Sequence, residues 1–180
     1  ITVHIVHVVQ LYYPVPSGSI RYFSEIGKRL VAHGHQVTVL TTEAYDLEAL
    51  WQTNRRVIDV PEEWHEGVRI VRFPVQRRGG HPLVYPVLRR LWVELGRLPV
   101  PVAWLRKFAA WTPQVPHIAQ WLTDQHATID VMHVTNVTLD GLIHPVMDVA
   151  ERFGIPVLCT PFMHLGEMHD PAFVRYYSMP

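Results

Sequence analysis

The loop at residues 12–19 holds the groups best suited to bind an anion. It reads Tyr-Tyr-Pro-Val-Pro-Ser-Gly-Ser and joins an apolar run, residues 1–9, to a helical pattern that begins at Ile20. The first amides of a helix have no partner within the helix and lie at its positive end, so they bind phosphate groups well. Gly18 and Ser19 are placed to present these amides. The alternative is a flexible turn in which one of the serines caps the helix.

A second candidate group is the imidazole of His164, which follows an apolar run ending at Thr160. In open parallel sheets, ligands bind at the carboxyl ends of strands. An imidazole at that place could contact a bound ligand, either as a neutral or as a charged group. The alternative is a loop histidine that bonds to the backbone. His133 lies within another apolar run, where a hydrogen-bonded core histidine is the common outcome, although the end of that strand faces the same edge.

The chain has 12 histidines, yet their spacing does not suggest a metal centre. His4 and His7 fall on opposite faces of a strand, because successive side chains alternate. His164, Glu167 and His169 do not form an HExxH motif. We therefore expect no bound metal.

A dinucleotide-binding domain is a further alternative. Glu43 follows the second apolar run, where the partner of an NAD ribose would lie. The GxGxxG fingerprint is missing, however, because Gly18 is the only glycine between Ile1 and Ser24. This absence argues against an NAD-dependent enzyme.

The candidate residues must be positioned by the apolar runs and helical patterns that alternate along the chain. This alternation predicts an α/β fold, a Rossmann-like, doubly wound and mostly parallel sheet with helices on both faces. The acidic segment 43–66 is expected to be irregular apart from one helical turn near 47–51. The expected strands are 1–9, 36–42, 67–74, 130–135 and a buried strand at 155–160; the expected helices are 20–33, capped by Ser17 or Ser19 and closed by Gly34, and 139–153.

Composition places the chain among ordinary globular proteins. Hydrophobic residues make up 48% and charged residues 18%, and the formal net charge is zero, which gives no reason to expect nucleic acid as a partner. The single cysteine, Cys159, excludes a disulfide framework and favours a reducing compartment. No apolar stretch reaches the roughly 18–20 residues of a membrane span, and no signal peptide is visible. We expect a cytoplasmic protein.

Residues 75–126 form the least regular part, because their prolines divide the segment into short helices. The basic, tryptophan-rich part at 77–121 has two interpretations. One is a peripheral surface that rests on anionic lipid. The other is a set of helices that pack their tryptophans into the domain while the arginines stay in water. The prolines favour the second, because they interrupt a long amphipathic face. The arginines would also suit a phosphate-bearing acceptor.

Read together, several segments resemble the N-terminal domain of glycosyltransferase family 4, the retaining type with the two-domain GT-B fold. The loop at residues 12–19 is similar to that family's Tyr-Pro…Gly-Gly loop, and Gly-His-Gln-Val at 34–37 is close to its Gly-His-Glu-Val strand. Asp-Val-Met-His at 130–133 and Gly-Ile-Pro-Val at 154–157 resemble two further strands. In one departure from the pattern, Ser19 stands where the family has its second loop glycine.

The resemblance implies an assignment for the whole chain. Residues 1–180 would be the Rossmann-like, acceptor-side domain, with an irregular helical insertion at about 75–126. The nucleotide-sugar domain with its Glu-x7-Glu motif would follow residue 180. The chain begins at Ile1 and ends without a capping element, so we expect a piece of a longer protein that is inactive alone.

The implied activity is transfer of a sugar, with retention, from a nucleotide-sugar to a hydroxyl of a small-molecule or lipid-linked acceptor, without a cofactor or metal. His164 would contact the transferred sugar as the catalytic residue, and Gly18 and Ser19 would bind the donor phosphates. Tyr13, His133 and Asn136 would be further cleft residues. The alternative from another class is a stand-alone module that binds a sugar or nucleotide without catalysis.

Overall fold

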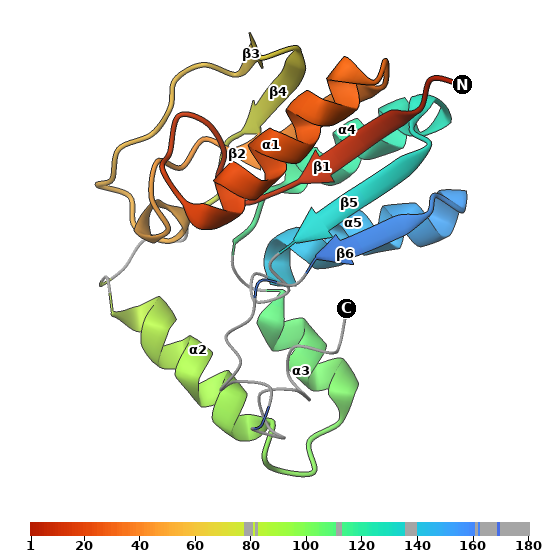
Figure 1. Ribbon diagram of the computed structural model, residues 1–180. Coiled ribbons are helices and arrows are strands. Elements are labelled where there is room, and N and C mark those ends of the chain that lie inside the picture. Colours follow the sequence, from red (N-terminus) through yellow and green to blue (C-terminus); the bar gives the residue numbers. More distant parts are fainter. Residues whose placement is uncertain are drawn as a thin grey trace.

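One sheet organises the molecule in the computed structural model, which describes residues 1–77, 81, 83–110, 113–135, 140–160, 162 and 169. In the described part the sheet has six strands in the order β3-β4-β2-β1-β5-β6 (Figure 1). Every neighbouring pair is parallel except β3 and β4. The predicted doubly wound, mostly parallel sheet is therefore confirmed. The strands are β1 (His4–Val8), β2 (Gln36–Thr42), β3 (Glu62–His65), β4 (Val68–Phe73), β5 (Val131–Thr135) and β6 (Val157–Thr160).

The strand order reverses beside β1. From β1 the chain continues to β2 on one side, whereas β5 pairs with the other side of β1. In open α/β sheets, ligands bind outside the carboxyl ends of the strands at such a switch point. The carboxyl ends of β1, β5 and β6 lie at one edge of the sheet, because these strands are parallel.

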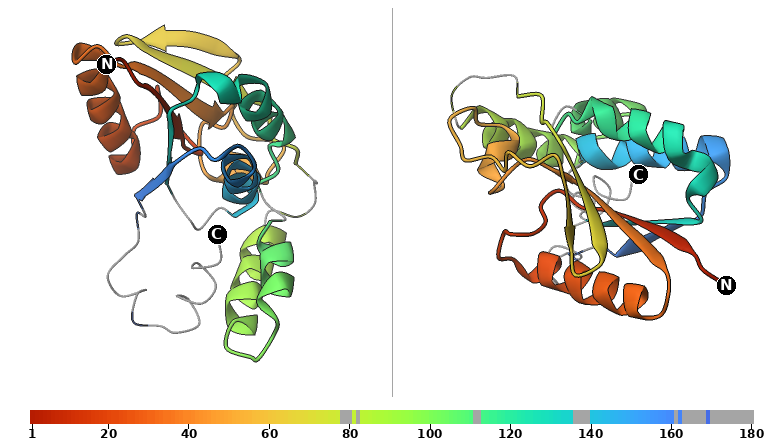
Figure 2. Two further views of the ribbon diagram at one scale, coloured as in Figure 1. Left: turned by 90° about the vertical axis from the view of Figure 1, so that its right-hand side faces the viewer. Right: turned by 90° about the horizontal axis from the view of Figure 1, so that it is seen from above.

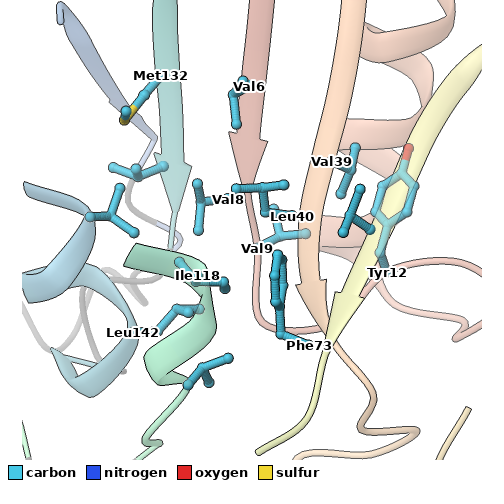
Figure 3. Packing of buried hydrophobic residues seen from close by; sticks show 14 of the residues in the cluster. Val6, Val8, Val9, Tyr12, Val39, Leu40, Phe73, Ile118, Met132 and Leu142 are labelled. Carbon is cyan, nitrogen blue, oxygen red and sulfur yellow. The ribbon is translucent and has the colours of Figure 1, made fainter. Parts of the chain in front are cut away.

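Helices cover both faces of the sheet, as the sequence predicts (Figure 2). Helix α1 (Gly18–Ala32) lies on one face, and α4 (Pro116–Gln125) and α5 (Asp140–Phe153) lie together on the other. Buried residues of the strands fill the space between these layers. In Figure 3, Ile118 of α4 and Leu142 of α5 belong to the same cluster as Val8 and Leu40 of the central strands.

Two 3₁₀ turns and two further helices complete the described elements. The turns are Glu48–Leu50, within the helical turn expected near 47–51, and His126–Thr128. Helices α2 (Val84–Leu95) and α3 (Val102–Ala109) form a hairpin that projects from the body of the molecule (Figures 1 and 2). Their limits follow the prolines, since α3 begins directly after Pro101 and Pro86 lies in the first turn of α2, where its missing N–H costs little. None of the helices in the described ranges combines the length and the apolar character that a membrane crossing requires.

Two sequence-based predictions about strands are wrong. Residues 155–160 were expected to form a buried strand, but β6 is the edge strand of the described sheet, and Leu158 is 57% exposed. The acidic segment 43–66, expected to be irregular, contains β3. This strand is held antiparallel to β4 by a tight turn at Glu66 and Gly67, whose φ angles are 49° and 79°. Two residues with positive φ are typical of a hairpin turn that matches the twist of the sheet.

Candidate ligand site at the carboxyl edge of the sheet

The N-terminus of α1 lacks a side-chain cap. Ser17 occupies the N-cap position in an extended conformation, yet its side chain makes no capping hydrogen bond. Its Oγ instead lies 3.1 Å from Oγ of Ser19, so the two hydroxyls satisfy one another. Ser17 is thus at the predicted cap position, but the capping hydrogen bond is not formed. The Ser17 side chain therefore leaves the first amides of the helix uncapped, and they keep their capacity to bind an anion.

Gly18 is the first residue of this helix and faces open space. A Cβ atom placed on Gly18 would meet no heavy atom within 4 Å. Packing within the described part of the chain therefore does not require a glycine here. Absence of a side chain leaves the backbone open to close approach by a ligand, which is the role predicted for this position. Ser19 is half-buried beside it, with its hydroxyl turned to Ser17.

A cavity of about 440 Å³ lies next to this helix terminus. Three segments bound it: the end of the first strand, the following loop and the chain after β2. Its walls are largely apolar, and they carry a single carboxylate and no lysine or arginine. The lining residues are Gln10, Leu11, Val15, Pro16, Ser17, Ser19, Tyr45, Asp46 and Leu47.

Gln10 is the most informative residue of the cavity, and the sequence analysis missed it. Its side chain is only 5% exposed, and its Oε1 makes no hydrogen bond to any described residue. A buried amide oxygen without a donor costs about 1–3 kcal/mol. Because the oxygen itself is buried, a hydroxyl or N–H group of a ligand could supply the missing donor only if the amide group turned toward the cavity. The available signal was a polar side chain directly after an apolar strand, at the end where ligands bind.

Hydrogen bonds and an ion pair brace the wall opposite the helix. Asp46 Oδ1 accepts a hydrogen bond of 2.8 Å from the Ala49 amide. Arg77 lies behind this wall, with its Nη1 2.7 Å from Glu43 Oε1 and its Nε donating to the Ala49 carbonyl at 2.6 Å. These contacts join the segment after β2 to the segment after β4. They hold Asp46 and Tyr45 at a fixed side of the cavity.

Tyr13 lies against the β3–β4 hairpin rather than in the cavity wall. Its ring stacks on His65 with centroids 3.7 Å apart, and its carbonyl accepts a hydrogen bond of 2.6 Å from Arg72 Nη2. Arg72 is buried and forms an ion pair with Glu63. The side chain of Tyr13 is 37% exposed, and its predicted place in the cleft stays a prediction.

His133 is packed under α1 together with a second histidine. Its Nε2 lies 2.8 Å from Thr160 Oγ1, and its ring centroid is 5.0 Å from that of His7 on the neighbouring strand. Phe23 of α1 covers both rings. Burial lowers the pKa of His133, and burial together with the charge that His133 would carry lowers the pKa of His7 to about 3. Both rings are therefore neutral at pH 7.

His164 and Asn136, the remaining sequence candidates, lie outside the described residues. The strands that precede them, β6 and β5, end at Thr160 and Thr135. These strand ends are joined, since Thr135 Oγ1 donates to the Thr160 carbonyl at 2.9 Å. The roles of His164 and Asn136 stay predictions.

His4 is held by hydrogen bonds within the protein and shares no site with His7. His4 contacts the Thr128 carbonyl at 2.8 Å and Thr38 Oγ1 at 2.9 Å, on the face of the sheet opposite to His7. Across the described ranges, no group of three or more histidine, cysteine, aspartate or glutamate side chains could hold a metal ion.

Comparisons with known proteins give a family match and several weak structural likenesses, two of which follow. The family described as "Glycosyl transferase 4-like domain" matches residues 17–179. No curated protein matches the chain in sequence. Sucrose-phosphate synthase from Thermosynechococcus elongatus is 16% identical with a TM-score of 0.48, covering 89% of this chain and 33% of its own. The catalytic domain of starch synthase IV from Arabidopsis thaliana, bound to ADP and acarbose, is 14% identical with a TM-score of 0.45, covering 89% of this chain and 34% of its own. The chain thus spans about a third of each of these structures.

Proposed function

Because the chain belongs to the glycosyl transferase 4-like domain family, we propose that it is the acceptor-side, N-terminal domain of a retaining glycosyltransferase. The full-length protein would move a sugar from a nucleotide-sugar to an acceptor hydroxyl. The observation that carries this proposal is the open, uncapped N-terminus of α1 beside a cavity at the switch point of the sheet. A C-terminal domain of the same polypeptide would bring the nucleotide-sugar to this edge.

The first amides of α1 would stabilise the departing diphosphate. In the transfer, the bond from the anomeric carbon to the phosphate oxygen breaks, and the sugar ring acquires oxocarbenium character. The acceptor oxygen forms its bond on the same face, and its proton passes to the leaving phosphate. Negative charge therefore grows on the phosphate, where prearranged amides are most effective. The contact between the Ser17 and Ser19 hydroxyls supports this role, because it holds the Ser19 side chain toward Ser17.

The cavity would hold the hydroxyl-bearing part of the acceptor. Asp46 offers a carboxylate that can accept hydrogen bonds from hydroxyl groups, and the Gln10 amide could do so after turning toward the cavity. His164 would position the transferred sugar, and Tyr13 and Asn136 would lie in the cleft. Because His133 is buried and contacts Thr160, we assign it a positioning role toward the end of β6.

The change Gly18→Val in the full-length protein tests the proposal. A valine here meets no protein atom at its Cβ, so the melting temperature should stay within a degree or two of the wild type. The side chain should obstruct the diphosphate, and kcat/KM should fall roughly 100-fold or more, as when a transition-state donor is lost. The assay is nucleotide release with a panel of nucleotide-sugars and acceptors.

The control is Arg29→Val, which places the same side chain on the last turn of the same helix, where Arg29 is 78% exposed. It should retain wild-type activity. If Gly18→Val is as active as this control, the helix terminus does not bind the donor. Donor binding that Gly18→Val weakens, without turnover in the wild type, would instead support the stand-alone binding module.

A further inference from the structure

The tip of the α2–α3 hairpin exposes a continuous apolar segment. Residues 97–104, which we call the hairpin tip, read Arg-Leu-Pro-Val-Pro-Val-Ala-Trp, and all are exposed except the half-buried Val100. Leu98 is 52% exposed, Val102 49% and Trp104 62%. Single exposed apolar side chains are common on protein surfaces, but a run of neighbours marks a contact surface.

The exposed surface continues along α2. Val84, Val87 and Leu91 are 44%, 64% and 51% exposed, and their spacing of three and four residues places them on one stripe of the helix. The opposite side of the hairpin is already occupied. Tyr85, Trp92 and Leu105 are buried, and Tyr85 packs on Trp51 of the body with ring centroids 4.8 Å apart. The exposed side chains are therefore not the internal core of the hairpin.

Charges along the hairpin are mainly positive. The sequence from Val84 to Ala109 contains Arg89, Arg90, Arg97, Arg106 and Lys107 against Glu94 alone. Glu94 lies 2.6 Å from Arg90 and 3.1 Å from Arg97. A partner for this surface must therefore combine an apolar layer with negative charge.

We propose that the hairpin tip docks on a membrane surface that contains anionic phospholipid. Leucine, valine and tryptophan side chains would enter the boundary of the acyl chains, and the basic side chains would face the headgroups. A neighbouring protein surface could cover the apolar residues, but the excess of basic over acidic residues in the hairpin sequence favours a partner of uniform negative charge. The proposal is independent of the transfer reaction, because it concerns a surface outside the cavity.

The exposed tip revises the interpretation, favoured by the prolines, that the helices of segment 77–121 pack their tryptophans into the domain. Trp92 does pack inward, as that interpretation expects, but Trp104 is exposed at the tip. Pro86 lies in the first turn of α2 and does not interrupt the helix, so the exposed stripe of α2 is continuous.

The test is sedimentation of the full-length protein with vesicles of phosphatidylcholine alone or with about one third phosphatidylglycerol. We expect binding to the anionic vesicles that weakens as NaCl is raised, and little binding to phosphatidylcholine alone. The double change Leu98→Glu and Trp104→Glu should lower the bound fraction roughly tenfold or more, because it removes apolar contact and adds repulsion. Both side chains are exposed, so the variant should fold.

The matched control is Trp64→Glu, because Trp64 is 64% exposed on β3 and lies outside the hairpin. It should bind vesicles as the wild type does. Failure of the wild type to bind anionic vesicles, or equal binding by the double variant, overturns the proposal. So does a lipid-free oligomer that the double variant converts to a monomer, since the tip would then be an interface between copies.

Discussion

His7 acts as an aromatic core residue rather than as a polar one. It is fully buried in β1, and neither ring nitrogen has a hydrogen-bond partner among the described residues. Its ring packs edge-on against Phe23 and His133, with centroids 5.1 and 5.0 Å away. An ionised imidazole at this place would lose its hydration without gaining an acceptor, so only the neutral form is compatible with the fold.

This burial makes stability depend on pH. The pKa of His7 is about 3 in the folded protein and near its ordinary value of 6.5 when unfolded. Between these values only the unfolded chain takes up the proton, so stability is complete above pH 6.5 and falls as the pH is lowered. The loss is about 1.4 kcal/mol per pH unit. Between pH 7 and pH 5 the unfolding free energy of His7→Leu should fall by about 2 kcal/mol less than that of the wild type. Urea denaturation at the two pH values measures this difference.

A control separates titration from packing. Ile5→Val lies on the same strand and face and removes buried volume without a titratable group. It should lower the unfolding free energy equally at both pH values. Equal pH dependence in His7→Leu and the wild type would show that His7 does not titrate in this range.

Sequence rules predicted some candidate site residues and missed another for a physical reason. Gly18 and Ser19 follow from the position of a helix start after a strand, which is a local feature. Gln10 could not be recognised, because its significance is a buried oxygen without a donor, and burial depends on the loops that fold over it. A serine cap is equally consistent with the sequence, but in the structure the Ser17 and Ser19 hydroxyls contact one another instead of the helix amides.

Among the elements, β3 of the β3–β4 hairpin is a strand that the sequence pattern does not predict. Its sequence, Glu-Glu-Trp-His, is poor in typical strand formers. Cross-strand pairs stabilise it instead: Glu62 Oε1 lies 2.8 Å from Arg69 Nε, and Glu63 pairs with Arg72. Similarly, the apolar run at 155–160 indicates a strand, but it does not indicate whether this strand pairs with one neighbouring strand or with two.

The turn of this hairpin should be intolerant of side chains. Gly67 has a φ of 79°, and a Cβ there would lie 2.7 Å from Val31 Cγ1 of α1. The positive φ costs about 1–2 kcal/mol for an alanine, and the crowding adds about 1–3 kcal/mol. We therefore expect Gly67→Ala to lower the unfolding free energy by about 2–5 kcal/mol, measured by urea denaturation.

Gly34→Ala is the matched comparison, because Gly34 has a similar φ of 83° with no heavy atom within 4 Å of its added Cβ. It should cost only the conformational part, about 1–2 kcal/mol. If both variants lose the same stability, Val31 moves aside freely and the turn is not packed against α1.

For the whole molecule, the arrangement of the sheet and the helices on its two faces follows from the alternation of apolar runs and helical patterns along the chain. The projecting α2–α3 hairpin does not follow from it. Period and turn residues predicted the parallel sheet with helices on both faces, because right-handed crossovers leave few arrangements. The prolines indicated where α2, α3 and α4 begin. No local pattern said that α4 would pack against α5 whereas α2 and α3 would project, since this depends on which apolar faces find a partner.

The proposed division of labour predicts that residues 1–180 fold but do not turn over. In this proposal the described residues would supply helix amides for a phosphate and a cavity for an acceptor, whereas the nucleotide-sugar would bind mainly to the C-terminal domain. The isolated piece should show a cooperative thermal transition by circular dichroism, because its sheet is covered by helices on both faces. With any nucleotide-sugar and acceptor that the full-length protein uses, product formation should not exceed a blank without enzyme. Transfer by the piece alone would place the complete active site within these residues and contradict the two-domain account.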